Sequence, residues 1–235
     1  MKLGDTGESR RQIQVMANLL GANDVQAEVN RRHFHRHNCL AVNIIGSPGA
    51  GKTTLLERTL TALAADCRIA VIEGDIYTSK DAERIARLDI PVIQVNTGGG
   101  CHLDSQMVGK VLPQFTWPGP ELLIIENVGN LVCPADFDLG EALKIVVLSV
   151  VEGDDKPAKY PVIFRNSQAV VLNKMDLLPF TETDLAAMKR DIFAINPEIV
   201  VFEVSCRTGE GLAVWQDWLR QLIRKYQGGA VFPSS

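Results

Sequence analysis

A glycine-rich stretch that ends in lysine and threonine constrains this chain more than any other feature. The sequence Gly46-Ser-Pro-Gly-Ala-Gly-Lys-Thr53 follows the apolar run Val42–Ile45 and precedes a helix-like run. It matches the pattern G-x-x-x-x-G-K-[ST] in the strand–loop–helix context that the pattern requires. Such a loop turns its backbone N–H groups toward phosphate oxygens, and the positive end of the following helix favours an anion. The stretch therefore predicts a P-loop that binds a nucleotide.

Residue types within this loop suit phosphate and magnesium. Glycines keep side chains out of the phosphate cradle, Lys52 offers a mobile positive charge to the β and γ phosphates, and Thr53 offers a hydroxyl to Mg²⁺. We expect nucleotide contacts from Gly46, Gly49, Gly51, Lys52, Thr53 and Thr54.

Short apolar runs rich in valine and isoleucine alternate with helix-like stretches from residue 41 onward. The apolar runs are Ala41–Ile45, Arg68–Glu73, Pro91–Val95, Glu121–Ile125, Lys144–Val150, Gln168–Leu172 and Ile199–Val204. The helix-like stretches are Lys52–Ala64, Ser79–Arg87, Leu103–Leu112, Glu182–Ile195 and Gly211–Lys225. Near-continuous apolarity suits strands covered on both faces. The alternation predicts an α/β fold with a mainly parallel central sheet, helices on both faces, and ligands beyond the carboxyl ends of the strands.

The two ends of the chain depart from this alternation. Residues 9–36 are polar with spaced apolar positions, and the break at Gly21–Asn23 suggests two short helices. We therefore expect a helical N-terminal extension over residues 1–38, a P-loop domain over residues 39–226 and a flexible tail over residues 227–235.

Charge and composition limit the binding partners and the cellular compartment that we expect for the protein. The net charge of −4 argues against a general nucleic-acid binder, which usually has a basic face. The N-terminus has no apolar signal core, and no apolar run reaches the length of a membrane span. Five cysteines in 235 residues do not resemble a disulfide framework. We expect a cytoplasmic protein with reduced thiols and with neither nucleic acid nor membrane as a partner.

A tetrapeptide after the sixth apolar run indicates which base is bound. Asn173-Lys-Met-Asp176 resembles the N-K-x-D motif of GTPases, although an exposed loop is the alternative. The Asp176 carboxylate can accept the N1–H and 2-amino hydrogens of guanine, which adenine does not offer in that arrangement. Asn173 can join the base to the P-loop, and the stem of Lys174 can lie along the ring. Ser205 begins a loop similar to the S-A-K loop of guanine pockets, but cysteine and arginine follow it.

Two acidic strand ends indicate the segments that sense the γ-phosphate. Glu73-Gly-Asp75 forms the end of the second predicted strand and Glu126 directly follows the fourth apolar run, so the carboxylates of Asp75 and Glu126 can approach Mg²⁺ or the attacking water. Glu126-Asn-Val-Gly129 resembles the D-x-x-G switch, in which the glycine amide contacts the γ-phosphate, and Thr78 can sense the same group. The alternative is that both acids only cap strands. We expect catalysis to depend on Lys52, Asp75, Glu126 and Gly129.

The residue after this switch bears on the rate. Asn130 occupies the position where many GTPases carry a water-orienting glutamine, and no arginine finger is evident. We therefore predict slow intrinsic hydrolysis that a dimer or another partner accelerates.

Two cysteines and a histidine form a candidate metal site. Cys101-His102 follows a run of three glycines, and Cys133 lies four residues beyond Gly129. Thiolate and imidazole suit Zn²⁺ or Ni²⁺. Three ligands leave such a site open, or two subunits share it about a two-fold axis; a buried cysteine pair without metal is the alternative. Because Cys133 follows the phosphate-sensing loop, we hypothesise that nucleotide state alters metal affinity.

Taken together, these residues resemble the hydrogenase nickel-incorporation GTPase family, HypB, a SIMIBI-class group of P-loop GTPases related to the urease accessory GTPases. The resemblance runs from about residue 30 to residue 219. It rests on the segments Gly46–Thr54, Glu73–Ile85, Thr97–Ser105, Glu126–Glu141, Lys156–Phe164 and Asn173–Leu178.

The resemblance implies a Mg²⁺-dependent GTPase that forms a homodimer with GTP. It implies that Cys101, His102 and Cys133 hold nickel or zinc, and that nickel passes toward [NiFe] hydrogenase. It also implies two partners, a second hydrogenase maturation protein and the hydrogenase large subunit. A urease-type nickel GTPase is the alternative within the fold, although that family usually shows Cys-Pro-His at its metal site. A regulatory GTPase without a metal role is the alternative from another class.

The N-terminal region differs from that of some family members. Residues 1–30 contain neither cysteine nor histidine, so the N-terminal nickel-storage clusters of those members have no counterpart there. His33, His35 and His37 form a cluster further on. A helix would place His33 and His37 on one face, where they could bind metal, but we favour a solvated basic turn that leads into the first strand.

Overall fold

A seven-stranded parallel sheet forms the centre of the protein. The computed structural model describes residues 6–75 and 80–229, with the backbone alone for residues 6–18. The strands are β1 (Leu40–Gly46), β2 (Ile69–Asp75), β3 (Val92–Asn96), β4 (Leu122–Glu126), β5 (Leu143–Ser149), β6 (Ala169–Asn173) and β7 (Val200–Glu203). Their order in the sheet is β3-β2-β4-β1-β5-β6-β7, and every pairing is parallel. All seven predicted strands are confirmed.

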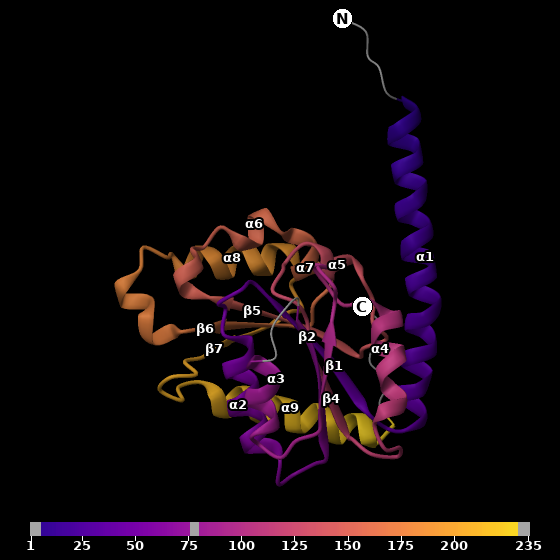
Figure 1. The fold of residues 1–235 in the computed structure, drawn as a ribbon. Coiled ribbons are helices and arrows are strands. Elements are labelled where there is room, and N and C mark those ends of the chain that lie inside the picture. Colours follow the sequence, from indigo (N-terminus) through magenta and orange to yellow (C-terminus); the bar gives the residue numbers. More distant parts are fainter. Residues whose placement is uncertain (1–5, 76–79, 230–235) are drawn as a thin grey trace, which may run out of the picture.

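Helices cover both faces of this sheet, as Figure 1 shows. They are α1 (Thr6–Arg36), α2 (Lys52–Leu63), α3 (Lys80–Ala86), α4 (Ser105–Val111), α5 (Cys133–Asp136), α6 (Lys156–Lys159), α7 (Pro161–Arg165), α8 (Leu185–Ile195) and α9 (Leu212–Gln227). The five predicted helices are confirmed. The short helices α5, α6 and α7 were not predicted, because four or five residues carry too little periodic signal. No helix among the described residues is long and apolar enough to cross a membrane.

Three clusters of buried side chains hold these layers together. On one face, α2 and α9 pack on the central strands around Trp215 and Leu56. On the other face, α1 and α4 cover β1, β2 and β4 around Phe34 and Leu103, while α7 and α8 cover β5 and β6 around Phe164. Since both faces are covered, the central strands β1, β5 and β6 are buried along their whole length, which explains their apolar composition.

The N-terminal segment forms one continuous helix, so the prediction of two short helices is wrong. Helix α1 runs from Thr6 to Arg36 and extends beyond the body of the molecule in Figure 1. A glycine in a helix interior costs about 1 kcal/mol relative to alanine. Contacts of Asn23 with residues 105 and 138 outweigh this cost at Gly21. At the other end of the chain, α9 ends at Gln227, and residues 230–235 of the predicted tail lie outside the described residues.

Candidate nucleotide and metal site

The P-loop joins the end of β1 to the start of α2. Gly51 immediately precedes α2 with φ of 94°, a left-handed conformation that favours glycine. Lys52 and Thr53 follow in the first turn and are buried. The Lys52 ammonium lies 3.4 Å from the carbonyl oxygen of Gly46, so it lies back over the loop. This backbone path leaves the loop amides at the N-terminus of α2 available to an anion.

Gly51 also touches the base-recognition segment, which leads to a first prediction. A Cβ atom at this position would lie 2.4 Å from Nδ2 of Asn173, in addition to the unfavourable φ. We expect Gly51→Ala to weaken GDP binding roughly 100-fold, because left-handed strain of about 1–2 kcal/mol combines with a lost hydrogen bond of about 1 kcal/mol. Titration of a fluorescent GDP analogue measures this change.

The matched control for this substitution is Gly153→Ala. Gly153 has a φ of 85° and open space at its Cβ position, so the change introduces similar strain away from the nucleotide. Equal affinities of the Gly51→Ala and Gly153→Ala proteins would contradict the contact between the P-loop and the base segment.

A cavity of about 560 Å³ lies beside the P-loop and contains buried carboxylates. Glu73 of β2 and Glu126 of β4 are register partners on adjacent strands and are both buried. Burial raises the pKa of Glu73 well above its usual range, and the negative charge of Glu126 raises it further. Burial also raises the pKa of Glu126, although Lys52 favours its ionised form. The cavity therefore carries an excess of buried acidic groups.

These carboxylates fit a divalent cation. One oxygen of Glu126 accepts a hydrogen bond from the Thr53 hydroxyl at 2.9 Å. The other oxygen of Glu126 and Oε2 of Glu73 are buried without a hydrogen-bond partner among the described residues. A hard cation with oxygen ligands suits such oxygen atoms. Asp75, predicted as a magnesium ligand, lines the same cavity.

Sequence reasoning missed three side chains of this cavity. Glu73 lies near the end of β2, directly before Gly74, and Asp81 and Arg84 lie on α3. Arg84 donates hydrogen bonds to Glu57 and Thr54 of α2, so it links the last turn of α3 to the helix after the P-loop. The position of Glu73 at the carboxyl end of a strand was the available signal. Thr78, which was expected to sense the γ-phosphate, lies outside the described residues.

The predicted switch segment lies directly against the P-loop. A Cβ atom at Gly129 would lie 2.9 Å from the ring of Pro48, so only glycine permits this approach. Asn130 then forms an antiparallel bridge with Gly46 at the end of β1. A phosphate bound by the P-loop therefore lies next to the backbone of the segment that follows Glu126.

Three predicted base-binding residues, Asn173, Lys174 and Asp176, line a separate cavity of about 220 Å³. Nδ2 of Asn173 donates to the carbonyl oxygen of Ala50 at 3.0 Å, which ties β6 to the P-loop. The Lys174 ammonium donates to the carbonyl of Gly49 at 2.7 Å. The Ser205 hydroxyl donates to Oδ1 of Asp176 at 2.6 Å, so Ser205 orients the carboxylate expected to read guanine.

Three candidate metal ligands converge although they come from two segments. Cys101 and His102 precede α4, and Cys133 begins α5. The sulfur of Cys101 lies 2.9 Å from the sulfur of Cys133 and 3.5 Å from Nδ1 of His102. The donor atoms of the three residues all lie within 4.8 Å of one another. Two sulfurs and an imidazole at this spacing can share one Zn²⁺ or Ni²⁺ ion.

The surroundings of these ligands favour a bound cation. The hydrogen bond with Cys101 raises the pKa of the Cys133 thiol, since two thiolates in contact repel each other, and burial adds to this effect. Burial lowers the pKa of His102, which keeps the imidazole in the neutral form that binds metals. The ring of His102 packs on the ring of Phe137, with centroids 4.0 Å apart. A cation would relieve the repulsion between the sulfurs.

Two asparagines connect the switch segment to the metal ligands. Nδ2 of Asn130 donates to the carbonyl oxygen of Cys101 at 3.3 Å. Oδ1 of Asn127, next to Glu126, accepts from the backbone N–H groups of Leu103 and Val128 at 2.9 and 3.0 Å. The segment that carries Cys101 is therefore bound to the segment that approaches the P-loop.

The favoured prediction for the histidine cluster, a solvated basic turn, is only partly right, since His35 is exposed and His37 lies in a turn but His33 and His37 are half-buried. His33 lies in the last turn of α1 and His37 directly follows the helix, with ring centroids 4.7 Å apart, and both rings pack against Trp117. Burial lowers the pKa of His33, and the nearby His37 and Arg36 add to this effect. The cluster is therefore part of the packing of α1 on the domain.

The other three cysteines do not join the metal site. Cys39 and Cys206 are buried and Cys67 is half-buried. Burial raises the pKa of Cys67 and of Cys206 to about 11, so both thiols stay protonated near neutral pH. Cys67 lines a further cavity of about 720 Å³ at the amino ends of β2 and β4, away from every motif described above.

Comparisons with known proteins agree with this geometry. The family model of the CobW/HypB/UreG nucleotide-binding domain matches residues 40–203. Hydrogenase maturation factor HypB of Azotobacter chroococcum is 48% identical over 211 residues, which cover 90% of this chain and 69% of that protein. The crystal structure of HypB from Archaeoglobus fulgidus superimposes with a TM-score of 0.82 at 40% identity, covering 86% of this chain and 99% of that one.

A second solved structure contains a metal. HypB from Helicobacter pylori in complex with nickel superimposes with a TM-score of 0.82 at 33% identity, covering 91% of this chain and 98% of that one. With the family model, the sequence relatives and the two solved structures in agreement, the chain belongs to the CobW/HypB/UreG family and, within it, to the hydrogenase maturation factors HypB.

Proposed function

We propose that this protein is a GTPase metallochaperone in which the nucleotide controls a nickel site. It binds and hydrolyses GTP, and its cargo is nickel for the maturation of a [NiFe] hydrogenase. One observation carries the proposal: the sulfurs of Cys101 and Cys133 lie 2.9 Å apart, and Cys133 belongs to the segment that begins at the P-loop contact of Gly129. A change in the phosphate that Gly129 approaches would therefore move one metal ligand relative to the other two.

The residues around the P-loop support phosphoryl transfer to water. Lys52 would neutralise charge on the β and γ phosphates, and the amide of Gly129 would hold the γ-phosphate. Thr53, Glu126 and Asp75 would hold Mg²⁺, which would supply positive charge to neutralise the phosphates. The acidic cavity described above supports magnesium, because one buried carboxylate oxygen of Glu73 and one of Glu126 have no hydrogen-bond partner among the described residues.

We propose slow intrinsic hydrolysis, and Asn130 supports this. Its amide group donates to the carbonyl of Cys101, and its oxygen accepts from the N–H of Val132. Asn130 occupies the position of the usual water-orienting residue, and its side chain therefore forms hydrogen bonds with the segments that carry Cys101 and Cys133. A partner that supplies a positive charge or orients the water would raise the rate.

The open coordination of the metal site supports a role in transfer. Three protein ligands leave a fourth position for an incoming or outgoing ligand. We propose nickel as the cargo, with zinc able to bind the same donors. We further propose a GTP-dependent homodimer, and a second maturation protein and the hydrogenase large subunit as partners. The free state of all five cysteines supports a reducing compartment, for which we propose the cytoplasm.

The convergence of Cys101, His102 and Cys133 favours this function over the two alternatives. A regulatory GTPase without a metal role has no need for two sulfurs beside a histidine at its switch. A urease-type nickel GTPase would use the same mechanism with another recipient, but the proline usual between its cysteine and histidine is missing here.

Nickel affinity in two nucleotide states tests the proposal. We expect the affinity of the GDP form and the form with a non-hydrolysable GTP analogue to differ by about 5- to 150-fold, the range of typical coupling free energies. Isothermal titration of Ni²⁺ into both forms measures this, with sizing of each sample to report the dimer. Linkage requires that nickel change the ratio of the two nucleotide affinities by the same factor. Equal nickel affinities in both states would refute the coupling.

A further inference from the structure

Helix α1 contacts both segments that carry the metal ligands. Its face with Asn23, Ala27 and Asn30 is buried against α4 and against the loop that follows α5. Glycines permit this close approach on both sides. A Cβ atom at Gly109 of α4 would lie 2.7 Å from the amide of Gln26, and one at Gly140 would lie 2.4 Å from the carbonyl oxygen of Ala27.

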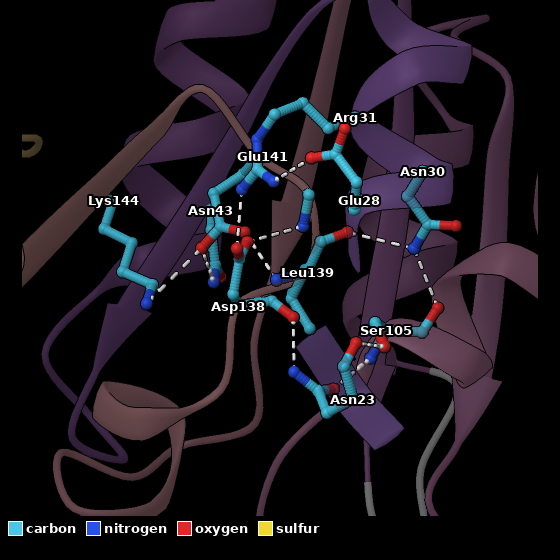
Figure 2. Close-up of polar contacts among 11 residues, drawn as sticks. Asn23, Glu28, Asn30, Arg31, Asn43, Ser105, Asp138, Leu139, Glu141 and Lys144 are labelled. Carbon is cyan, nitrogen blue, oxygen red and sulfur yellow. Dashed lines mark hydrogen bonds and ion pairs between the residues drawn. The ribbon is translucent and has the colours of Figure 1, made fainter. Parts of the chain in front are cut away.

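Two asparagines of α1, seven residues apart, each span the two segments (Figure 2). Nδ2 of Asn30 donates to the carbonyl oxygen of Ser105 at 2.8 Å and to that of Leu139 at 3.0 Å. Asn23 donates to the carbonyl oxygen of Asp138 at 2.8 Å and accepts from the N–H of Ser105 at 2.9 Å. Each side chain therefore links residue 105, just after Cys101-His102, to residues 138–139, just after Cys133.

The chain between these contacts and the ligands is short and well packed. Leu103, between His102 and Ser105, is fully buried, and its N–H donates to Asn127. On the other side, Phe137 directly precedes Asp138 and packs on the ring of His102. A displacement of either contact would therefore also displace the nearby metal ligands.

A second, deeper chain of hydrogen bonds joins the same two segments from the sheet side. The buried carboxylate of Glu141 accepts from the N–H of Leu139 at 2.6 Å and from Asn43 of β1 at 3.1 Å (Figure 2). Asn43 in turn accepts from Asn127 at 3.2 Å, and Asn127 holds Leu103. The two segments that carry the metal ligands are thus joined by hydrogen bonds through β1 on the sheet side and through α1 on the other side.

The chemistry of the helix face indicates that these contacts serve more than packing. Asn23 and Asn30 are 4% and 1% exposed, and burial of an amide is unfavourable unless it forms hydrogen bonds. Apolar side chains such as Ala27 would suffice to pack the helix. The amides supply what an apolar side chain cannot, a directional link of fixed length to backbone groups of two separate segments.

We propose that Asn23 and Asn30 are positioning residues for the metal site, which set the separation between Cys101-His102 and Cys133. This inference rests on the proposed metal-binding function. It adds α1, which contributes no metal ligand, as the element that holds the two halves of the site together, and it predicts that a change confined to α1 alters metal binding.

Substitution of each asparagine by aspartate tests the inference. Asn30→Asp keeps the side-chain size but replaces a donor with an acceptor that faces two carbonyl oxygens. Asn23→Asp is milder, since it keeps the acceptor for Ser105 and loses only the link to Asp138. We expect Co²⁺ to bind each variant about 10–100-fold more weakly, the range typical of groups that orient metal ligands. The absorption of thiolate-bound Co²⁺ reports both the affinity and the ligand geometry.

A matched control separates positioning from general destabilisation. Leu219→Ala in α9 removes buried apolar contacts on the opposite face of the sheet. We expect this variant to lose stability toward denaturant and still bind Co²⁺ as the unchanged protein does. If both aspartate variants bind Co²⁺ with unchanged affinity and spectrum, the inference is wrong while the metal site stands. If the unchanged protein shows no thiolate band, the metal site fails and the inference fails with it. If the Asn30→Asp protein does not fold, the Co²⁺ affinity and spectrum of the Asn23→Asp protein decide whether the inference holds.

Discussion

Replacement of Asp176 by asparagine is expected to weaken GTP binding by roughly 100- to 10,000-fold and to create a preference for xanthosine triphosphate. Hydrogen bonds to a charged group contribute about 1.5–3 kcal/mol each, and guanine offers two hydrogens to this carboxylate. The Ser205 hydroxyl, which donates to Oδ1 at 2.6 Å, would keep the amide oxygen in that place. The amide NH₂ would then face the 2-amino group of guanine, donor against donor, whereas the 2-oxo group of xanthine accepts it.

Competition of both triphosphates against a fluorescent guanine nucleotide measures this preference. Asp191→Asn, the same chemical change on the exposed surface of α8, is the matched control and should leave both affinities unchanged. Unchanged GTP affinity of the Asp176→Asn protein would show that the cavity between Asn173 and Ser205 does not hold the base.

Removal of the Cys133 sulfur is expected to produce the second large effect. Zinc binding by structural four-ligand sites is worth roughly 10–16 kcal/mol, so one ligand contributes on the order of 3 kcal/mol. We expect Cys133→Ser to bind Ni²⁺ at least about 100-fold more weakly. We also expect the remaining binding to lose its dependence on nucleotide, because the ligand attached to the phosphate-sensing segment is the one removed.

Cys67→Ser provides the control, since this half-buried thiol lies outside the metal site. Titration of Ni²⁺ into both variants with GDP and with the GTP analogue completes the comparison. Equal nickel affinities in the Cys133→Ser and Cys67→Ser proteins would support the alternative of a regulatory GTPase whose cysteines are only structural.

Local sequence patterns predicted most of the fold, because the strands are buried on both faces. Runs such as Leu122–Ile125 and Ala169–Leu172 are therefore apolar at every position, and this signal can be recognised without any knowledge of neighbouring strands. The P-loop and the Asn173–Asp176 segment could also be predicted, because the residues of each motif lie close together in the sequence at fixed spacing.

What sequence could not predict depends on contacts between distant residues. The position of β4 between β2 and β1 in the sheet follows from packing of the whole chain and leaves no local pattern. The approach of Cys101 to Cys133, 32 residues apart, was expected from the chemistry of thiol and imidazole ligands and from the family resemblance, and no local pattern indicates it. The continuity of α1 past Gly21 also depends on remote partners, since Asn23 binds residues 105 and 138. The low helix propensity of glycine had instead predicted a break in the helix at that position.

The closeness of the two sulfurs has one further consequence, in redox chemistry. Cys101 is exposed, and its sulfur lies 2.9 Å from that of Cys133. Neighbouring thiols with an accessible partner can be oxidised to a disulfide, which leaves neither sulfur free as a thiolate donor. Occupancy by a cation and a reducing compartment both keep the pair in its working form. The same short distance between sulfurs on which the proposed nickel site depends would therefore make that site sensitive to the redox state of its surroundings.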